Sequence, residues 1–130
     1  MLTRRMLLAS TAALIDMPCA SALTAIGVAF AQPAFEAAQA AGRSIVIEIG
    51  ASWCPVCRVQ KPILEDLVMS DRFKDVVLFE VDFDRQKEVL RKFGASKQST
   101  LIVFKGAHEV GRSIGEVKPA AIEALLAKAL

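Results

Sequence analysis

The stretch ASWCPVCRVQKP, residues 51–62, is the most informative part of the sequence for both fold and function. Two cysteines three positions apart, Cys54 and Cys57, follow Trp53 in it. A C-x-x-C pair is compatible with a redox couple, a metal clip or a structural staple, and the motif alone does not separate the three. The rest of the chain supplies the distinction.

The first 31 residues have the pattern of an export signal. Arg4 and Arg5 precede an apolar run over residues 6–15, and the order Thr-Arg-Arg-Met-Leu-Leu in residues 3–8 resembles a twin-arginine signal. We expect cleavage after Ala31, within Ala-Phe-Ala, or alternatively after Ala22, within Ala-Ser-Ala. The predicted organisation is a cleaved signal, residues 1–31, followed by one domain, residues 32–130.

An uncleaved membrane anchor is the alternative to cleavage, because apolar residues continue over residues 20–31. Asp16 and Pro18 interrupt the run, and neither part reaches the roughly 18–20 residues of a spanning helix. Export to a periplasm-like compartment is therefore expected, where a dithiol can be oxidised and remain so. The third cysteine, Cys19, would be lost with the signal.

The composition argues against a nucleic-acid partner. The chain has 130 residues, a length that fits one domain. Its formal net charge is +2, and 54% of its residues are hydrophobic. No part of it has the basic footprint typical of nucleic-acid binding. We expect a monomer.

The domain alternates predicted helices and strands. The helices cover residues 35–41, 54–70, 85–93 and 119–130, and the strands cover residues 45–49, 76–83, 100–104 and 109–114. A helix joins the first two strands, which should be parallel, and a short turn joins the last two, which should be antiparallel. The predicted fold class is α/β, with a mixed four-stranded sheet flanked by helices. The cysteine pair then follows the carboxyl end of the first strand, where α/β proteins place their sites.

The spacing of the cysteines predicts unequal roles. Cys54 would cap the helix, where unpaired N–H groups and the positive end of the helix dipole favour a thiolate. Cys57 would lie one turn inside the helix, close enough to form a disulfide but shielded. Pro55 suits the first helical turn because it has no N–H to leave unpaired.

The two other interpretations of the pair fit less well. A structural zinc site needs four ligands, and beyond the two cysteines the domain offers only His108 in a distant turn. A structural disulfide that closes so small a loop would add little stability, because the entropic effect grows with loop length. A redox couple is favoured, and no metal site is expected.

From about Phe35 onward the chain resembles the thioredoxin family. The resemblance is carried by Trp53-Cys54-x-x-Cys57, Pro62, the strand end at residues 81–84, Phe93-Gly94, the stretch at residues 99–105 and Gly115. It implies a thioredoxin-like fold trimmed of the first thioredoxin strand. It also implies disulfide exchange without a cofactor, in which Cys54 attacks a disulfide and Cys57 resolves the mixed intermediate.

Three positions acquire a role, or a departure, through this resemblance. Glu48 interrupts the apolar run of its strand and matches the buried acid that helps to deprotonate the resolving cysteine, so we expect it to lie behind the dithiol with a raised pKa. Glu80 stands where many relatives carry a lysine near that acid. Ser99 replaces the usual cis-proline, and we expect a trans Gln98–Ser99 bond because a non-proline cis bond costs about 2.5–4 kcal/mol. Trp53, Ser99 and Thr100 are the residues expected to bind substrate.

The predicted function is that of an exported thiol–disulfide oxidoreductase, more reducing than oxidising, since no histidine stands at Val56 beside the cysteines. Its partners would be protein thiols and disulfides, with a membrane electron donor for thioredoxin-like proteins. The alternative is a copper or iron–sulfur module that uses the same cysteines, because soft thiolates suit Cu(I). An adaptor with no redox activity is the third interpretation.

Overall fold

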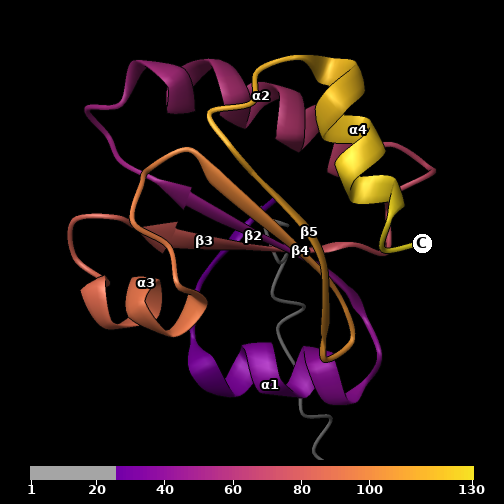
Figure 1. Cartoon of the computed structure of the whole chain (residues 1–130). Coiled ribbons are helices and arrows are strands. Elements are labelled where there is room, and N and C mark those ends of the chain that lie inside the picture. The colour runs from indigo at the N-terminus through magenta and orange to yellow at the C-terminus, as the bar shows by residue number, and fades with distance from the viewer. Residues whose placement is uncertain (1–25) are drawn as a thin grey trace, which may run out of the picture.

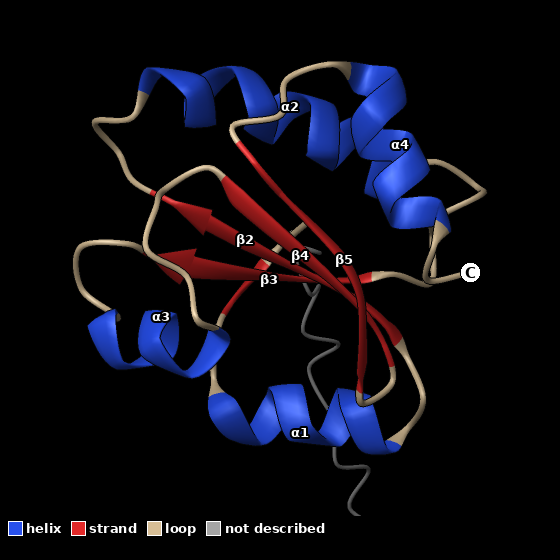
Figure 2. Ribbon diagram, viewed as in Figure 1, coloured by secondary structure: helices blue, strands red, loops and turns tan. Residues whose placement is uncertain are grey.

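The computed structural model describes residues 26–130, which build a central sheet with helices on both faces (Figures 1 and 2). In chain order the elements are β1 (Val28–Ala29), α1 (Gln32–Ala40), β2 (Ser44–Gly50), α2 (Pro55–Met69), β3 (Val77–Asp82), α3 (Lys87–Phe93), β4 (Thr100–Lys105), β5 (His108–Ile114) and α4 (Pro119–Ala127). The arginine pair and Cys19 of the predicted signal lie outside the described residues.

The sheet has the strand order β1-β3-β2-β4-β5. β2 is parallel to β3 and antiparallel to β4, and β4 is antiparallel to β5. The predicted α/β fold, with a parallel first pair and an antiparallel last pair, is confirmed. β2 is thus a central strand, which explains its nearly continuous apolar sequence.

The strand count differs from the predicted four, because β1 adds a short fifth strand beside β3. Phe30, which follows β1, is only 6% exposed and packs its ring against Phe35, Phe79 and Phe93. Its N–H donates to the carbonyl of Glu80 at 2.8 Å. The sheet is therefore not trimmed of a first strand: the residues that were assigned to the end of the signal form one.

The two faces of β2 contribute to different cores. Ile45, Ile47 and Ile49 face the cluster that includes Phe30 and Phe35, on the side that α1 and α3 cover (Figure 1). Val46 faces the opposite cluster, under α2 and α4. Side chains alternate along a strand, so Glu48 points to the same side as Val46, beneath α2. One acidic residue thus enters an otherwise apolar layer.

Helix α2 begins directly after the cysteine that caps it. Cys54 is the N-cap residue and Pro55 opens the helix, as predicted from the sequence. Its buried residues, Cys57, Gln60, Leu64 and Val68, recur at helical spacing and face the sheet. In residues 26–130, no helix has the length and apolar character needed to cross a membrane.

Candidate active site

Cys54 and Cys57 form a disulfide at the start of α2, with their Cα atoms 5.3 Å apart. The backbone N–H of Cys57 donates to Cys54 Sγ at 3.1 Å. After reduction, this N–H and the positive end of the helix would stabilise a thiolate on Cys54. The local geometry therefore gives the two sulfurs different surroundings, as the spacing indicated.

The predicted order of exposure is wrong in this disulfide form. Cys54 is 1% exposed and Cys57 is 6% exposed, so the first cysteine is the more buried one. Ser99 covers both sulfurs, which lowers the exposure of both cysteines. Cys57 keeps slightly more exposure because it also lines a cavity behind the disulfide.

Ser99 lies directly against the disulfide. Its Oγ is 3.1 Å from Cys54 Sγ and 3.0 Å from Cys57 Sγ. Neither sulfur of a disulfide carries a proton, so the hydroxyl is the donor, and its single proton is shared between the two contacts or directed at one of them. Ser99, which the resemblance marks as a substrate-binding residue, thus contacts the cysteines through its side chain.

The backbone at Ser99 differs from that of a proline. The Gln98–Ser99 bond is trans, as expected, and Ser99 has a φ of 59°. Proline is restricted to a φ near −65°, so it cannot adopt this conformation without a change in the loop. Glycine can, because it has no Cβ. A glycine substitution therefore removes the hydroxyl with the least disturbance of the backbone.

A buried glutamine holds this loop in place. Gln60 Nε2 donates to the carbonyls of Ser99 at 3.2 Å and of Glu116 at 2.9 Å. The N–H of Gly115 also donates to the Ser99 carbonyl, at 2.9 Å. The sequence analysis missed Gln60, although its spacing from Cys57 and Leu64 puts an amide on the buried face of the helix.

The other two predicted substrate-binding residues differ in accessibility. Trp53 is 52% exposed, and its Nε1 donates to Asp84 Oδ2 at 2.8 Å while the ring packs edge-on against Phe83. Its ring is thus fixed beside the cysteines with one part open to solvent. Thr100 is buried, and its hydroxyl donates to the carbonyl of Lys97 at 2.7 Å. Its side chain stabilises the loop.

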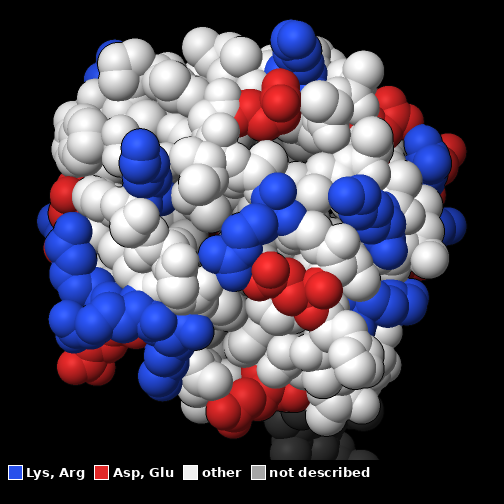
Figure 3. Space-filling view, in the orientation of Figure 1, with Lys and Arg blue, Asp and Glu red and all other residues white. Residues whose placement is uncertain are grey.

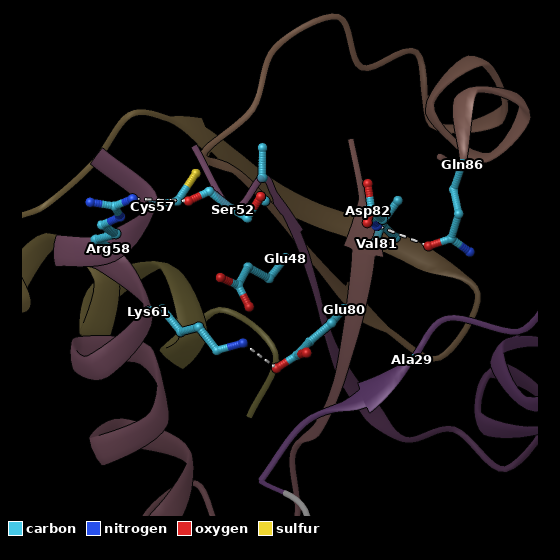
Figure 4. Close-up of a pocket in the computed structure, with 12 residues that line it drawn as sticks. Ala29, Glu48, Ser52, Cys57, Arg58, Lys61, Glu80, Val81, Asp82 and Gln86 are labelled. Atoms are coloured by element: carbon cyan, nitrogen blue, oxygen red, sulfur yellow. Dashed lines mark hydrogen bonds and ion pairs between the residues drawn. The ribbon is translucent and has the colours of Figure 1, made fainter. Parts of the chain in front are cut away.

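Glu48 lines a cavity of about 410 Å³ that extends from Cys57 to Lys61 and Glu80 (Figure 4). Glu48 is 4% exposed and pairs in register with Glu80 on the neighbouring strand. The pKa of Glu48 is raised from 4.5 to about 7, mainly because the carboxyl group is buried. The charge of Lys61 opposes this rise, and the charges of Glu80 and Glu65 add to it. The predictions that Glu48 is buried with a raised pKa and lies near Glu80 are confirmed.

Lys61 supplies the positive charge that lies beside the two glutamates of this cavity. Its Nζ is 2.9 Å from Glu80 Oε1, and Figure 4 shows the side chains of Lys61, Glu80 and Glu48 converging. Burial lowers the pKa of Lys61, but the hydrogen bond to Glu80 and the charge of Glu48 raise it more. The sequence analysis missed this lysine. Its position four residues after Cys57, on the same side of α2, was the available signal.

The copper or iron–sulfur alternative finds no support. In the part of the chain that the structure describes, no group of three or more His, Cys, Asp or Glu residues is arranged to hold a metal ion. His108 is exposed at the start of β5, at the end of β4 remote from Thr100. Within residues 26–130, these residue types therefore offer the cysteine pair no third ligand.

We predict that Glu48→Gln changes how stability depends on pH. The pKa of Glu48 is about 7 in the folded protein, against an ordinary value of 4.5, so the folded state binds a proton that the unfolded state has lost. This contribution is complete below about pH 4.5 and is lost as the pH rises through 7. Wild type should lose about 3 kcal/mol relative to Glu48→Gln over this range.

The measurement is urea unfolding of the oxidised proteins from pH 4 to pH 8, with Asp66→Asn, at an exposed position of α2, as the control. The disulfide keeps the cysteines from titrating. Parallel stability profiles for wild type and Glu48→Gln would contradict a buried carboxyl with a raised pKa.

Comparison with known proteins places this geometry in a family. The thioredoxin family model matches residues 28–128. Thioredoxin-2 of Saccharomyces cerevisiae is 32% identical over 94 residues, covering 72% of this chain and 88% of the yeast protein. Thioredoxin H2-2 of Oryza sativa is 39% identical over 74 residues, but the chain spans only about half the length of this relative.

Solved structures agree with the sequence matches. A crystal structure described as Trxlp from Edwardsiella tarda is 40% identical, with a TM-score of 0.74, and the match covers 76% of this chain and 96% of that one. The thioredoxin of Nicotiana alata is 26% identical, with a TM-score of 0.67, over 75% of this chain and 83% of that one. The family-model match, over residues 28–128, includes β1 and the cysteine pair. The chain belongs to the thioredoxin family.

Proposed function

We propose that this protein reduces disulfides of protein clients outside the cytosol, with Cys54 as the nucleophile and Cys57 as the resolving cysteine. The observation that carries the assignment of roles is the N–H of Cys57, which donates to Cys54 Sγ at the helix N-terminus. A thiolate is favoured there, and the thiolate is the form that attacks a disulfide.

The reaction is a two-step exchange. The Cys54 thiolate attacks one sulfur of the client disulfide, the client S–S bond breaks, and the released client thiolate takes a proton from solvent. Cys57 then loses its proton and attacks Cys54 Sγ. The Cys54–Cys57 bond forms, the mixed disulfide breaks, and the second client thiol leaves. The client gains two electrons and the protein dithiol loses them.

Glu48 is suited to accept the proton of Cys57. Both residues line the same cavity, and the pKa of Glu48, about 7, allows it to gain and lose a proton near neutral pH. The cavity also provides a route for the proton, because the partly exposed Lys61–Glu80 pair lies at its other end. In this role Glu48 acts on the second step and not on the first attack.

Exposed apolar side chains near the cysteines support a protein client. Trp53, Val56 and Val59 are all exposed. Trp53 precedes Cys54, and Val56 lies between the two cysteines. A client chain could lie across them and hydrogen-bond to the backbone before β4, by strand addition. Val56 also leaves the pair without an adjacent histidine, which supports a reducing role. A reduction potential well above that of the glutathione couple would overturn this direction.

We predict that Cys57→Ser traps clients. Without the resolving thiol, Cys54 should remain joined to client proteins, and these adducts should disappear when a reductant is added. The measurement is non-reducing electrophoresis and mass spectrometry of the protein isolated from its host compartment. Cys54→Ser is the matched control and should trap none. Equal trapping by the two variants, or none by Cys57→Ser, would contradict the assigned roles.

We also propose that export removes residues 1–22 and leaves β1 in the mature protein. Cleavage after Ala31 would discard Phe30, whose ring packs in the aromatic cluster and whose carbonyl accepts from Gln86 Nε2 at 3.3 Å. Removing a buried phenylalanine side chain typically costs about 3–5 kcal/mol. Cleavage after Ala22 keeps these contacts.

N-terminal mass spectrometry of the exported protein tests this processing. We expect Leu23 at the N-terminus, and we expect Ala22→Leu to block cleavage, because a signal peptidase requires a small residue there. Ala31→Leu, an exposed position, should leave cleavage unchanged. Gln32 at the N-terminus would contradict the proposal, and retention of Met1 in a membrane fraction would favour the anchor.

A further inference from the structure

The segment 85–97, which contains α3, carries an unusual concentration of positive charge. Its basic residues are Arg85, Lys87, Arg91, Lys92 and Lys97, and its single acidic residue is Glu88. The segment charge is +4 in a chain whose total is +2, so the rest of the chain is net acidic. All five basic residues are exposed, and Figure 3 shows blue side chains gathered over α3. We call these five residues the basic surface.

The basic surface is not neutralised by ion pairs. Across residues 26–130, the ion pairs within 4.0 Å are Lys61–Glu80, Arg72–Glu123 and Arg112–Glu109, and none involves the basic surface. The nearest acids along the chain have other partners. Asp82 accepts the N–H groups of Asp84 and Arg85, and Asp84 accepts from the Trp53 ring.

The fold does not depend on these charges. α3 is anchored by Leu90, which is buried, and by Arg112, which donates to the carbonyl of Phe93 at 2.9 Å. A left-handed Gly94 ends the helix. Among the hydrogen bonds, ion pairs and cation–π contacts within residues 26–130, the one that involves a side chain of the basic surface is Lys87 over the ring of Phe83. The remaining charges are free to act on something outside the chain.

The basic surface is linked at two points to residues that surround the cysteine pair. At one end, Lys87 Nζ is 4.0 Å from the centroid of Phe83, whose ring contacts Trp53. At the other end, Lys97 is two residues before Ser99, which contacts both sulfurs. A protein that presents a disulfide to Cys54 would therefore bring its own neighbouring residues over α3.

We propose that the basic surface docks an acidic segment that flanks the disulfide of the protein's redox partner. This inference rests on the proposed disulfide reduction and adds a charge preference to it. Charges arranged in this way raise the rate of encounter by about 10–10³-fold, and the effect weakens as salt is added. Recognition by charge would supplement the apolar contacts at Trp53 and Val56 and would select among clients.

Three peptides with the same disulfide test the proposal. They carry Glu, Gln or Lys at the flanking positions, and the rate constant for their reduction by the pre-reduced protein is measured at low and high ionic strength. We expect the Glu peptide to react fastest and the Lys peptide slowest at low salt, with the differences nearly lost at high salt. Arg91→Glu/Lys97→Glu should slow the Glu peptide roughly tenfold and change the Gln peptide little.

The matched control is Lys74→Glu/Lys105→Glu, which changes the net charge equally. Both lysines are exposed, and Lys105 pairs with Ser44 at the end of the sheet remote from the cysteines. This control should keep the preference for the Glu peptide. Equal rates for the three wild-type reactions, or equal effects of the two double variants, would overturn the docking proposal. Failure of the wild type to reduce the Gln peptide would instead overturn the proposed function.

Discussion

The contact between Ser99 Oγ and the two sulfurs joins two parts of the site that lie far apart in the chain. It spans 45 residues to Cys54 and 42 to Cys57, and it brings the loop before β4 onto the start of α2. Gln60 of α2 and Gly115 after β5 fix the Ser99 carbonyl, so three elements determine where the hydroxyl lies. A hydroxyl that must donate to sulfur in the disulfide form can donate to a thiolate after reduction, where the bond is stronger.

The two sides of the disulfide have different surroundings. Behind it, the buried Glu48 shares a cavity with Cys57, Lys61 and Glu80. In front of it, the exposed indole of Trp53 and the basic surface lead to α3. Proton transfer and partner binding can thus occur on separate faces. A change in one should leave the other largely intact.

The α/β fold, the strand directions and the place of the cysteines could be predicted from the sequence. The spacing of apolar residues, the lengths of turns and the N-cap of a helix are local properties of the chain. Glu48 could be singled out because it interrupts an apolar strand. β1 could not, because an apolar run before a helix looks the same in a signal as in a strand. Lys61 and Gln60 were missed, since their roles depend on partners that only the folded chain brings close. The left-handed φ of Ser99 and the low exposure of Cys54 likewise arise from tertiary packing.

We expect the Ser99 hydroxyl to control the reactivity of Cys54 by stabilising its thiolate. The titration of the Cys54 thiol measures this effect. The rate of alkylation of reduced Cys57→Ser protein, measured against pH, gives the pKa of Cys54 with Ser99 present and with Ser99→Gly. A hydrogen bond to a charged group contributes about 1.5–3 kcal/mol, so we expect the pKa of the Cys54 thiol to rise by about one to two units in the Ser99→Gly protein. Ser96→Gly, in the same loop, should cause no rise. An unchanged pKa of Cys54 in the Ser99→Gly protein would show that the Ser99 hydroxyl does not stabilise the Cys54 thiolate.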